Sequence, residues 1–243
     1  MARHLILTLE GPLSAFGAEM VDARGPVRDW PGASLLTGLL ANALGLTRGQ
    51  RDAHARLQER LDFAIRIERE GTRLRDFQTA QLGQSDQGWT TRGAPEGRAG
   101  GAGTYKSPHI RERDYLADAL VTVALVLQPA AEPPSLDELA AALAEPARPL
   151  FLGRKPCLPS RPIFGGFIAA DDTLAAVRLA ERPDGWASPD PYLVAPERPG
   201  LPTAWERVFV TDERNWISGA HGGERIFRRG LASRLSAGES GPS

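Results

Sequence analysis

The chain has 243 residues, of which 42% are hydrophobic, enough for one large domain or two small ones with a proper core. No run of eighteen apolar residues and no signal-peptide pattern is present, so we expect a cytoplasmic protein without contact to a membrane. The formal net charge of −1 excludes the strongly basic balance of a protein that binds nucleic acid by itself and regardless of sequence.

Two elements are predicted near the start of the chain. Residues 3–10 form a short apolar run that ends at Gly11 and Pro12, which predicts a buried strand and a turn. Pro31 is well placed to open a helix. An apolar stripe at helical spacing then runs to Gly45 and consists of Leu35, Leu36, Leu39, Leu40, Ala43 and Leu44.

Three further elements follow in the middle of the chain. Residues 61–69 (LDFAIRIER) alternate apolar and charged side chains, which is typical of a half-buried strand that exposes Asp62, Arg66 and Glu68. Residues 118–129 are apolar and rich in β-branched residues, which predicts a central strand covered on both faces. The helix that follows is predicted to begin with the capping box of Ser135 and Glu138 and to stop at Pro146.

The order of these elements predicts an α+β fold. With a fourth strand from either 148–154 or 161–169, the pattern is β-α-β-β-α-β, that of a ferredoxin-like (RRM-like) domain over residues 1–170. We expect residues 171–232 to form a smaller C-terminal β-rich appendage and residues 233–243 a disordered tail.

The connection at about 71–114 is far longer than a usual hairpin loop, which indicates a functional or a disordered segment. Its second half is basic and carries Trp89 and Tyr105 between the cations Arg92, Arg98, Lys106, Arg111 and Arg113. Cations that follow phosphates and rings that stack on bases suit single-stranded nucleic acid. A solvated surface hairpin would show the same composition.

Two other segments combine cations with turn residues. Residues 147–170 carry Arg148, Arg154, Lys155 and Arg161 without a carboxylate, and this stretch is either a phosphate-binding loop or a tight strand connection. Its cysteine, Cys157, is predicted to be a small buried hydrophobe and, as the only cysteine, forms no internal disulfide. With four scattered histidines as well, we expect neither a metal nor another cofactor.

The segment before the first helix contains Arg24 and Arg28, and the N-terminus of that helix would offer free N–H groups to an anion. Phe16 and Trp30 lie in the same segment. Their rings are placed either to stack on bases or to pack against the sheet.

Four motifs in this order resemble those of the RAMP proteins of CRISPR systems, most closely the Cas-five family of the type I-E Cascade complex. They are LEGPLSAFG (9–17), RGPVRDWPGASLLTGLLANALG (24–45), YKS (105–107) with RERDYLADA (111–119), and FLGRKPCLPSRPIF (151–164). The resemblance implies a RAMP core with a long β-hairpin thumb at about 71–114. It also implies a non-catalytic subunit, in antiviral defence, that caps the 5′ handle of the CRISPR RNA (crRNA).

The resemblance further implies partners and contacts. The thumb would pack against the adjacent backbone subunit of Cascade, the large PAM-reading subunit would dock nearby, and target DNA would be approached only indirectly. The candidate contacts to the RNA handle are Arg24, Arg28, Lys106, Arg111, Arg113, Arg154, Lys155 and Arg161. A subunit that works inside a ribonucleoprotein needs no global positive field, which agrees with the net charge of −1.

Two alternatives remain open at this stage. Tyr105, Lys106 and His109 have the side-chain types for metal-independent RNA cleavage, and the type I-C member of the family processes precursor RNA from a comparable region. Ser107 and Pro108 separate the lysine from the histidine here, which favours holding RNA over cutting it. A scaffold that contacts only protein is the second alternative.

Overall fold

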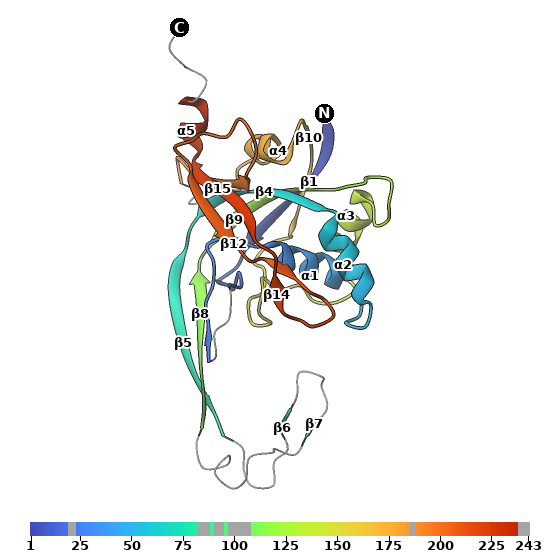
Figure 1. Cartoon of the computed structure of the whole chain (residues 1–243), viewed down its shortest axis with the longest axis vertical. Coiled ribbons are helices and arrows are strands. Elements are labelled where there is room, and N and C mark those ends of the chain that lie inside the picture. The colour runs from blue at the N-terminus through green and yellow to red at the C-terminus, as the bar shows by residue number, and fades with distance from the viewer. Residues whose placement is uncertain (19–22, 82–87, 90–94, 97–107, 185–187, 238–243) are drawn as a thin grey trace.

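A seven-stranded antiparallel sheet forms the centre of the molecule (Figure 1). The computed structural model describes residues 1–18, 23–81, 88–89, 95–96, 108–184 and 188–237. Across the sheet the strands are β10 (Phe164–Ala170), β1 (Ala2–Glu10), β9 (Leu120–Leu127), β4 (Leu61–Arg69), β11 (Tyr192–Pro196), β15 (Arg225–Leu231) and β12 (Glu206–Val210). Helices cover the sheet, so the prediction of a mixed α+β fold is confirmed.

The strands β1, β4, β9 and β10 follow the predicted β-α-β-β-α-β connectivity. Two helices, α1 (Ala33–Ala43) and α2 (Arg51–Glu59), connect β1 to β4, and α3 (Leu136–Ala144) connects β9 to β10. Of the two segments considered for the fourth strand, the later one forms β10. The helix α2 was not predicted, because its amphipathic pattern has only His54 and Leu57 as buried residues.

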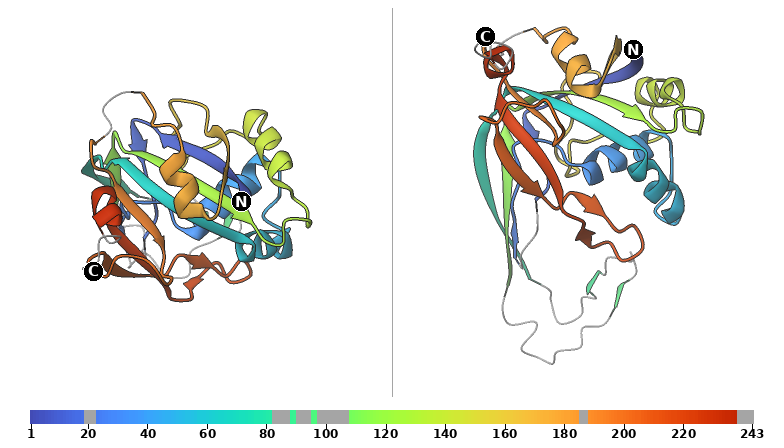
Figure 2. Two further views of the ribbon diagram at one scale, coloured as in Figure 1. Left: turned by 90° about the horizontal axis from the view of Figure 1, so that it is seen from above. Right: turned by 45° about the horizontal axis from the view of Figure 1, so that its top comes forward.

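Each face of the sheet has its own layer of helix (Figure 2). On one face, Leu36 and Leu40 of α1 pack with Leu5 and Leu7 of β1 in the main core, to which α3 also contributes. On the other face, α4 (Thr173–Leu179) covers small residues such as Ala64. The strand β9 lies between these two layers and is buried along its whole length, as predicted.

The strand β4 is buried on both faces, so the predicted exposure of Arg66 and Glu68 is wrong. The two side chains form an ion pair beneath α4. The Arg66 guanidinium also donates to the carbonyl oxygens of Val177 (2.6 Å) and Ala180 (3.0 Å) at the end of that helix. The charged face of β4 can be buried because Arg66 and Glu68 pair with each other. Arg66 also satisfies carbonyl groups that the C-terminus of α4 leaves without an intrahelical partner.

The helix α3 begins with the predicted capping box. The Ser135 hydroxyl accepts from the Glu138 N–H at 3.2 Å, and the Glu138 carboxylate accepts from the Ser135 N–H at 2.6 Å. Both contacts satisfy N–H groups that the first turn of a helix leaves without an intrahelical partner.

The helix α1 begins in a different way, because its N-cap residue Gly32 has no side chain. A carboxylate oxygen of Asp212 accepts from the Ala33 N–H at 2.7 Å, and the Asp212 carbonyl accepts from the Ser34 N–H at 2.9 Å. The expectation that this helix end offers free N–H groups to an external anion is thus wrong, since the chain's own carboxylate occupies it.

The C-terminal strands β11, β15 and β12 continue the central sheet, because β11 pairs with β4. The division into a core over 1–170 and an appendage over 171–232 stays a prediction. A short hairpin of β13 (Glu213–Arg214) and β14 (His221–Gly222) leaves this region and approaches α1 and α2. Residues 233–237 belong to the helix α5 (Ala232–Ala237) and not to a disordered tail, whereas 238–243 lie outside the described residues.

The long connection is built on a two-stranded arm that extends out of the body (Figure 1). The arm consists of β5 (Thr72–Ala80) and β8 (His109–Ala117), which pair antiparallel from Thr72 opposite Ala117 to Ala80 opposite His109. On its other edge β8 pairs with β2 (Leu13–Ser14) and β3 (Arg24–Gly25). A small pair, β6 (Gly88–Trp89) and β7 (Pro95–Glu96), lies between the two long strands in sequence.

Candidate nucleic-acid interface

Three segments that are distant in sequence meet at the root of the arm, which we define as β3, residues 112–115 of β8 and the loop 151–158. Arg154 in the loop donates to the carbonyl oxygen of Asp114 at 2.7 Å and to that of Gly25 at 2.8 Å. Its guanidinium carbon also lies 4.9 Å from the centre of the Tyr115 ring. One side chain therefore joins the loop to both strands.

The loop is held against the N-terminal segment at Gly153. Its φ of +99° lies in the region that favours glycine, and the Leu152 carbonyl accepts from the Ala15 N–H at 2.9 Å. A Cβ on Gly153 would lie 2.0 Å from the Ala15 carbonyl oxygen. The close approach that positions Arg154 thus requires glycine at this position.

Cations outnumber carboxylates at the root. Asp114 accepts from Arg75 at 2.8 Å and lies 3.7 Å from Arg24. The hydrogen bond from Arg75, and then the charges of Arg75 and Arg24, hold the pKa of Asp114 below its usual value in spite of its burial. Arg113 donates to the carbonyl of Ala23 at 3.1 Å. Since Arg113 and Arg154 bond to neutral carbonyls, their charges remain available to an anion.

Two further candidates at or near the root are exposed. Lys155 follows Arg154 in the loop and forms none of the ion pairs found within the described part of the chain. Arg111 lies farther out on β8 and donates to the neighbouring carbonyl of Ile110 at 2.9 Å. Both side chains are placed where they can contact phosphates without first breaking an ion pair.

Arg28 and Arg161 have partners in the chain itself. Arg28 donates to the carbonyl of Thr211 at 3.0 Å, which directs it toward the C-terminal region. Arg161 forms an ion pair of 2.6 Å with Glu10, and Arg69 contacts the same carboxylate at 3.1 Å. Arg161 is therefore already engaged by a carboxylate, which it shares with Arg69.

Tyr105, Lys106 and the side chain of His109, the three candidates for RNA cleavage, lie outside the described residues. Their positions relative to one another are therefore not described. Within the described ranges, no group of three histidine, cysteine or acidic side chains is placed to hold a metal ion. No helix in that same part of the chain is long and apolar enough to span a bilayer.

Phe16 and Trp30 are buried in the main core, so they pack against the sheet and are not available to stack on bases. Cys157 is fully buried as well, which confirms its predicted role as a small hydrophobe. Burial raises the pKa of its thiol, which disfavours the nucleophilic thiolate.

Sequence reasoning missed a groove beside the root, between α1 and the β13–β14 hairpin. Two adjoining cavities of about 340 and 400 Å³ share Gly38, Asn42, Arg214 and Trp216 in their linings, and Arg154 lines the smaller one. The signal in the sequence was weak, because Arg214 and Trp216 lie in a short turn-rich segment with no repeated pattern.

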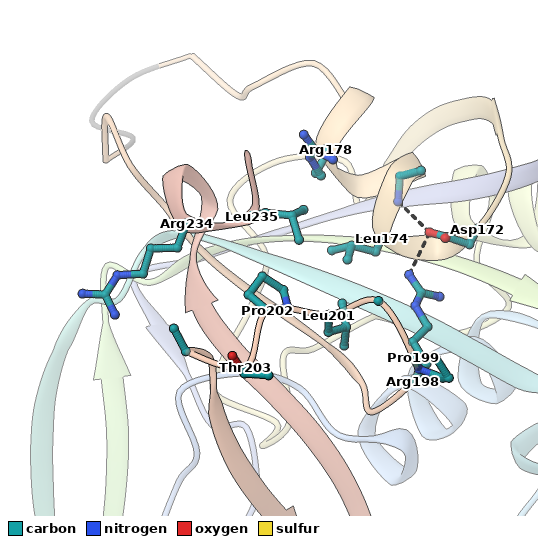
Figure 3. A pocket seen from close by; sticks show the side chains of 13 residues that line it. Asp172, Leu174, Arg178, Arg198, Pro199, Leu201, Pro202, Thr203, Arg234 and Leu235 are labelled. Carbon is teal, nitrogen blue, oxygen red and sulfur yellow. Dashed lines mark hydrogen bonds and ion pairs between the residues drawn. The ribbon is translucent and has the colours of Figure 1, made fainter. Parts of the chain in front are cut away.

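A larger cavity of about 680 Å³ lies near α4 and α5, away from every candidate residue. Figure 3 shows that Arg198 points to Asp172, and the two form an ion pair of 2.9 Å. Asp172 also caps α4 by accepting from the Ala175 N–H at 2.8 Å. This pairing serves the helix start, so we do not place the functional site there.

The chain is similar over most of its length to CRISPR-associated proteins. The family model described as CRISPR-associated protein (Cas_Cas5) matches residues 4–228, and the chain belongs to this family. The chain is 34% identical over 179 residues to the CRISPR system Cascade subunit CasD of Escherichia coli (strain K12). The aligned region covers 73% of this chain and 76% of that relative.

Solved structures agree with this assignment. A chain of the structure "CRISPR RNA-guided surveillance complex" matches with a TM-score of 0.68 and 26% identity, over 94% of this chain and 89% of the other. A chain of "Crystal structure of Cas protein" matches with a TM-score of 0.58 and 24% identity over 94% of each chain, a likeness that concerns the fold alone. The family resemblance stated from the four sequence motifs is thereby confirmed.

Proposed function

We propose that this chain is the non-catalytic, RNA-binding subunit of a type I-E CRISPR Cascade surveillance complex in the cytoplasm, where it binds and caps the 5′ handle of the crRNA. The observation that carries the proposal is the convergence of Arg113 and Arg154, from distant segments, on one face of the root, while Arg24 lies beside Asp114 on the other face. The similarity to CasD and to a chain of an RNA-guided surveillance complex supports it.

The root provides what a single-stranded RNA end requires. Guanidinium groups that bond to neutral carbonyls are held in fixed positions and keep their charge for phosphate oxygens. The exposed cations Lys155 and Arg111 extend this surface along the loop and the arm. Binding through such a local cluster is consistent with a chain whose net charge is −1.

The arm is the proposed contact to the adjacent backbone subunit, with the large PAM-reading subunit nearby and target DNA approached only indirectly. Phe77 on β5 is 61% exposed and Ile110 on β8 is 45% exposed. Phe77 lies opposite Glu112, two residues from Ile110, so both apolar side chains belong to the same face of the arm. Exposed apolar side chains that neighbour each other support a protein partner at this face.

The test is assembly of the complex with a Lys155→Glu and Arg111→Glu double variant. These two side chains are exposed and make no ion pair in the described structure, so the fold should survive the charge reversal. We expect about tenfold or greater loss of crRNA retention and a weaker dependence of binding on salt. Arg178→Glu, an exposed reversal on α4 at the other face of the sheet, is the matched control.

The outcomes also separate the alternatives. Normal crRNA retention by the double variant would overturn the proposal, and binding without any salt dependence would favour the protein-only scaffold. Incubation of the chain with repeat RNA in EDTA tests the metal-independent endoribonuclease. A site-specific product that is absent with His109→Ala would assign cleavage to Tyr105, Lys106 and His109, against the proposed non-catalytic role.

A further inference from the structure

The cavity of about 680 Å³ between α4, the loop 198–204 and α5, which we call the α4–α5 cavity, lies apart from the RNA-binding surface. Its volume is within the range of about 300–1,000 Å³ that is usual for ligand pockets. In Figure 3, Leu174 of α4 and Leu235 of α5 point toward each other across it, and Leu201 lines it from the loop. These three leucines belong to the smaller core on the α4 face of the sheet or pack against it, whereas Leu152 of the root loop belongs to the main core. The cavity and the root therefore lie on opposite faces of the sheet.

The loop that forms one wall of the cavity is held in a fixed shape. Pro199 and Pro202 each fix one backbone angle, and the Pro202 carbonyl accepts from the Trp205 N–H at 3.0 Å. Trp205 is 2% exposed and packs so closely on β15 that a Cβ on Gly230 would lie 2.1 Å from its ring. Because such a wall does not have to become ordered when a ligand arrives, the entropic cost of binding is lower.

The edge of the cavity is cationic. Arg178 in the last turn of α4 and Arg234 in α5 are exposed, and neither forms an ion pair with another residue of the described chain. Asp172 is the one carboxylate in the described lining, and it is paired with Arg198 at 2.9 Å. Asp190 lies near Arg234 but does not line the cavity. Two guanidinium charges at the edge are therefore left for an external anion.

The lining suits an anion with aliphatic groups better than it suits a nucleotide. None of the side chains described in the lining is aromatic, so a base would find no ring on which to stack. The leucines and prolines instead match aliphatic side chains, and a guanidinium group binds a carboxylate through two N–H groups at once. Both kinds of group occur together in a peptide where glutamate or aspartate alternates with leucine or isoleucine.

We propose that the α4–α5 cavity binds a short acidic peptide segment of another protein. An aliphatic side chain of that segment lies between Leu174 and Leu235, and its carboxylates contact Arg178 and Arg234. This docking site is additional to the RNA-binding role and does not depend on it. Because the cavity and the root lie on opposite faces of the sheet, the chain can hold RNA and this partner at the same time.

The first experiment measures the binding of a labelled peptide, in which glutamates alternate with leucines, to the full chain by fluorescence anisotropy. We expect saturable binding that weakens with added salt, since exposed charges are screened. Replacing the glutamates by glutamines should raise the Kd about tenfold or more, because the guanidinium groups lose their charged partners. Replacing the leucines by serines should have an effect of the same size, about tenfold, because the aliphatic contacts are lost.

Variants of the chain test the same site from the other side. Arg178→Glu with Arg234→Glu should weaken the acidic peptide about tenfold or more, because attraction becomes repulsion. Thr203→Glu, an exposed substitution in the loop wall, should also weaken it while all arginines are kept. Arg51→Glu is the matched control, an exposed reversal at the start of α2 on the face of the main core, and it should bind the peptide like the wild type.

The second experiment locates the bound peptide. One leucine of the peptide is replaced by the photoreactive residue benzoylphenylalanine, the mixture is irradiated, and the crosslinked segments of the chain are identified by mass spectrometry. We expect crosslinks in α4, in the loop 198–204 and in α5. The double variant of Arg178 and Arg234 should lose them.

Three results would overturn the proposal. They are the absence of saturable binding up to about 1 mM peptide, crosslinks that fall only outside these three segments, and equal binding of the glutamine peptide. A single-stranded oligonucleotide is the competing probe, and its displacement of the crosslinked peptide would assign the cavity to phosphates instead. None of these results affects the proposed function, because crRNA retention is tested with Lys155 and Arg111 at the root and on the arm.

Discussion

The guanidinium carbon of Arg154 lies 4.9 Å from the centre of the Tyr115 ring, so a loop near residue 154 stacks on a strand some forty positions earlier in the chain. Two hydrogen bonds to main-chain carbonyls complete the contact. The groups that accept from Arg154 are neutral main-chain carbonyls and not carboxylates. Arg154 is therefore at once a structural link and a retained positive charge, two roles that mutations can separate.

Arg154→Gln should lower the free energy of unfolding by about 1–3 kcal/mol, because two partly buried carbonyls lose their donor. Urea unfolding followed by circular dichroism measures the change. Lys155→Gln, one position later and exposed, should stay within about 0.5 kcal/mol of the wild type. Equal stability of the two variants would show that the hydrogen bonds of Arg154 contribute nothing to the fold.

Gly153→Ala should destabilise the protein by more than about 2 kcal/mol, since a positive φ and a clash with the Ala15 carbonyl act together. Gly166 provides a matched control, because its φ of +101° is close to the +99° of Gly153 and a Cβ there meets nothing within 4 Å. Gly166→Ala should cost only about 1–2 kcal/mol of backbone strain. Thermal unfolding of both variants gives the comparison, and equal losses would contradict the role of the close approach.

The carboxylate of Asp114 makes stability depend on pH in the acid range. The hydrogen bond from Arg75 lowers the pKa of Asp114 in the folded state below its value in the unfolded chain. The ionised form therefore contributes stability above about pH 4, and this contribution is lost as the pH falls through the lower folded-state pKa. Denaturant titrations should show that the difference in unfolding free energy between wild type and Asp114→Asn shrinks below about pH 4. A difference that stays constant into strong acid would contradict this.

The elements with local signals were predictable, and those fixed by distant contacts were not. The capping box at Ser135 and the apolar strand β9 are each determined by residues close together in the sequence, and both are present as predicted. The burial of Arg66 and Glu68 depends on α4, more than a hundred residues later, so the alternating pattern of β4 indicated the wrong exposure. A pattern of period two shows which residues share a face and not what covers that face.

The same distinction applies to the candidate site. The cations of the arm and the loop were found because they cluster in sequence and because four motifs resemble a known family. The groove residues Arg214 and Trp216 come from the β13–β14 hairpin and Arg48 from the turn before α2. Only the docking of the hairpin on α2 through Gln58 brings them together. Residues that come together only in the folded chain leave no recognisable pattern in the sequence.

The start of α1 is capped by a carboxylate from a distant part of the chain. Asp212 accepts from the Ala33 N–H at 2.7 Å and lies 3.3 Å from Arg225, so its carboxylate fixes the start of α1, which lines the groove beside the root. Asp212→Ala should cost about 2 kcal/mol, the upper end for loss of a cap, because the site is buried. The local cap Ser135→Ala should cost about 1 kcal/mol.

Asp212→Asn refines this test, because the amide oxygen still accepts from the Ala33 N–H while the charge opposite Arg225 and the positive helix end is removed. Its unfolding free energy should therefore lie between those of the wild type and of Asp212→Ala, in urea titrations at constant ionic strength. If Asp212→Ala lost no more than Ser135→Ala, the remote carboxylate would add nothing to an ordinary local cap. In that case α1 would be held only by the packing of its leucines against β1.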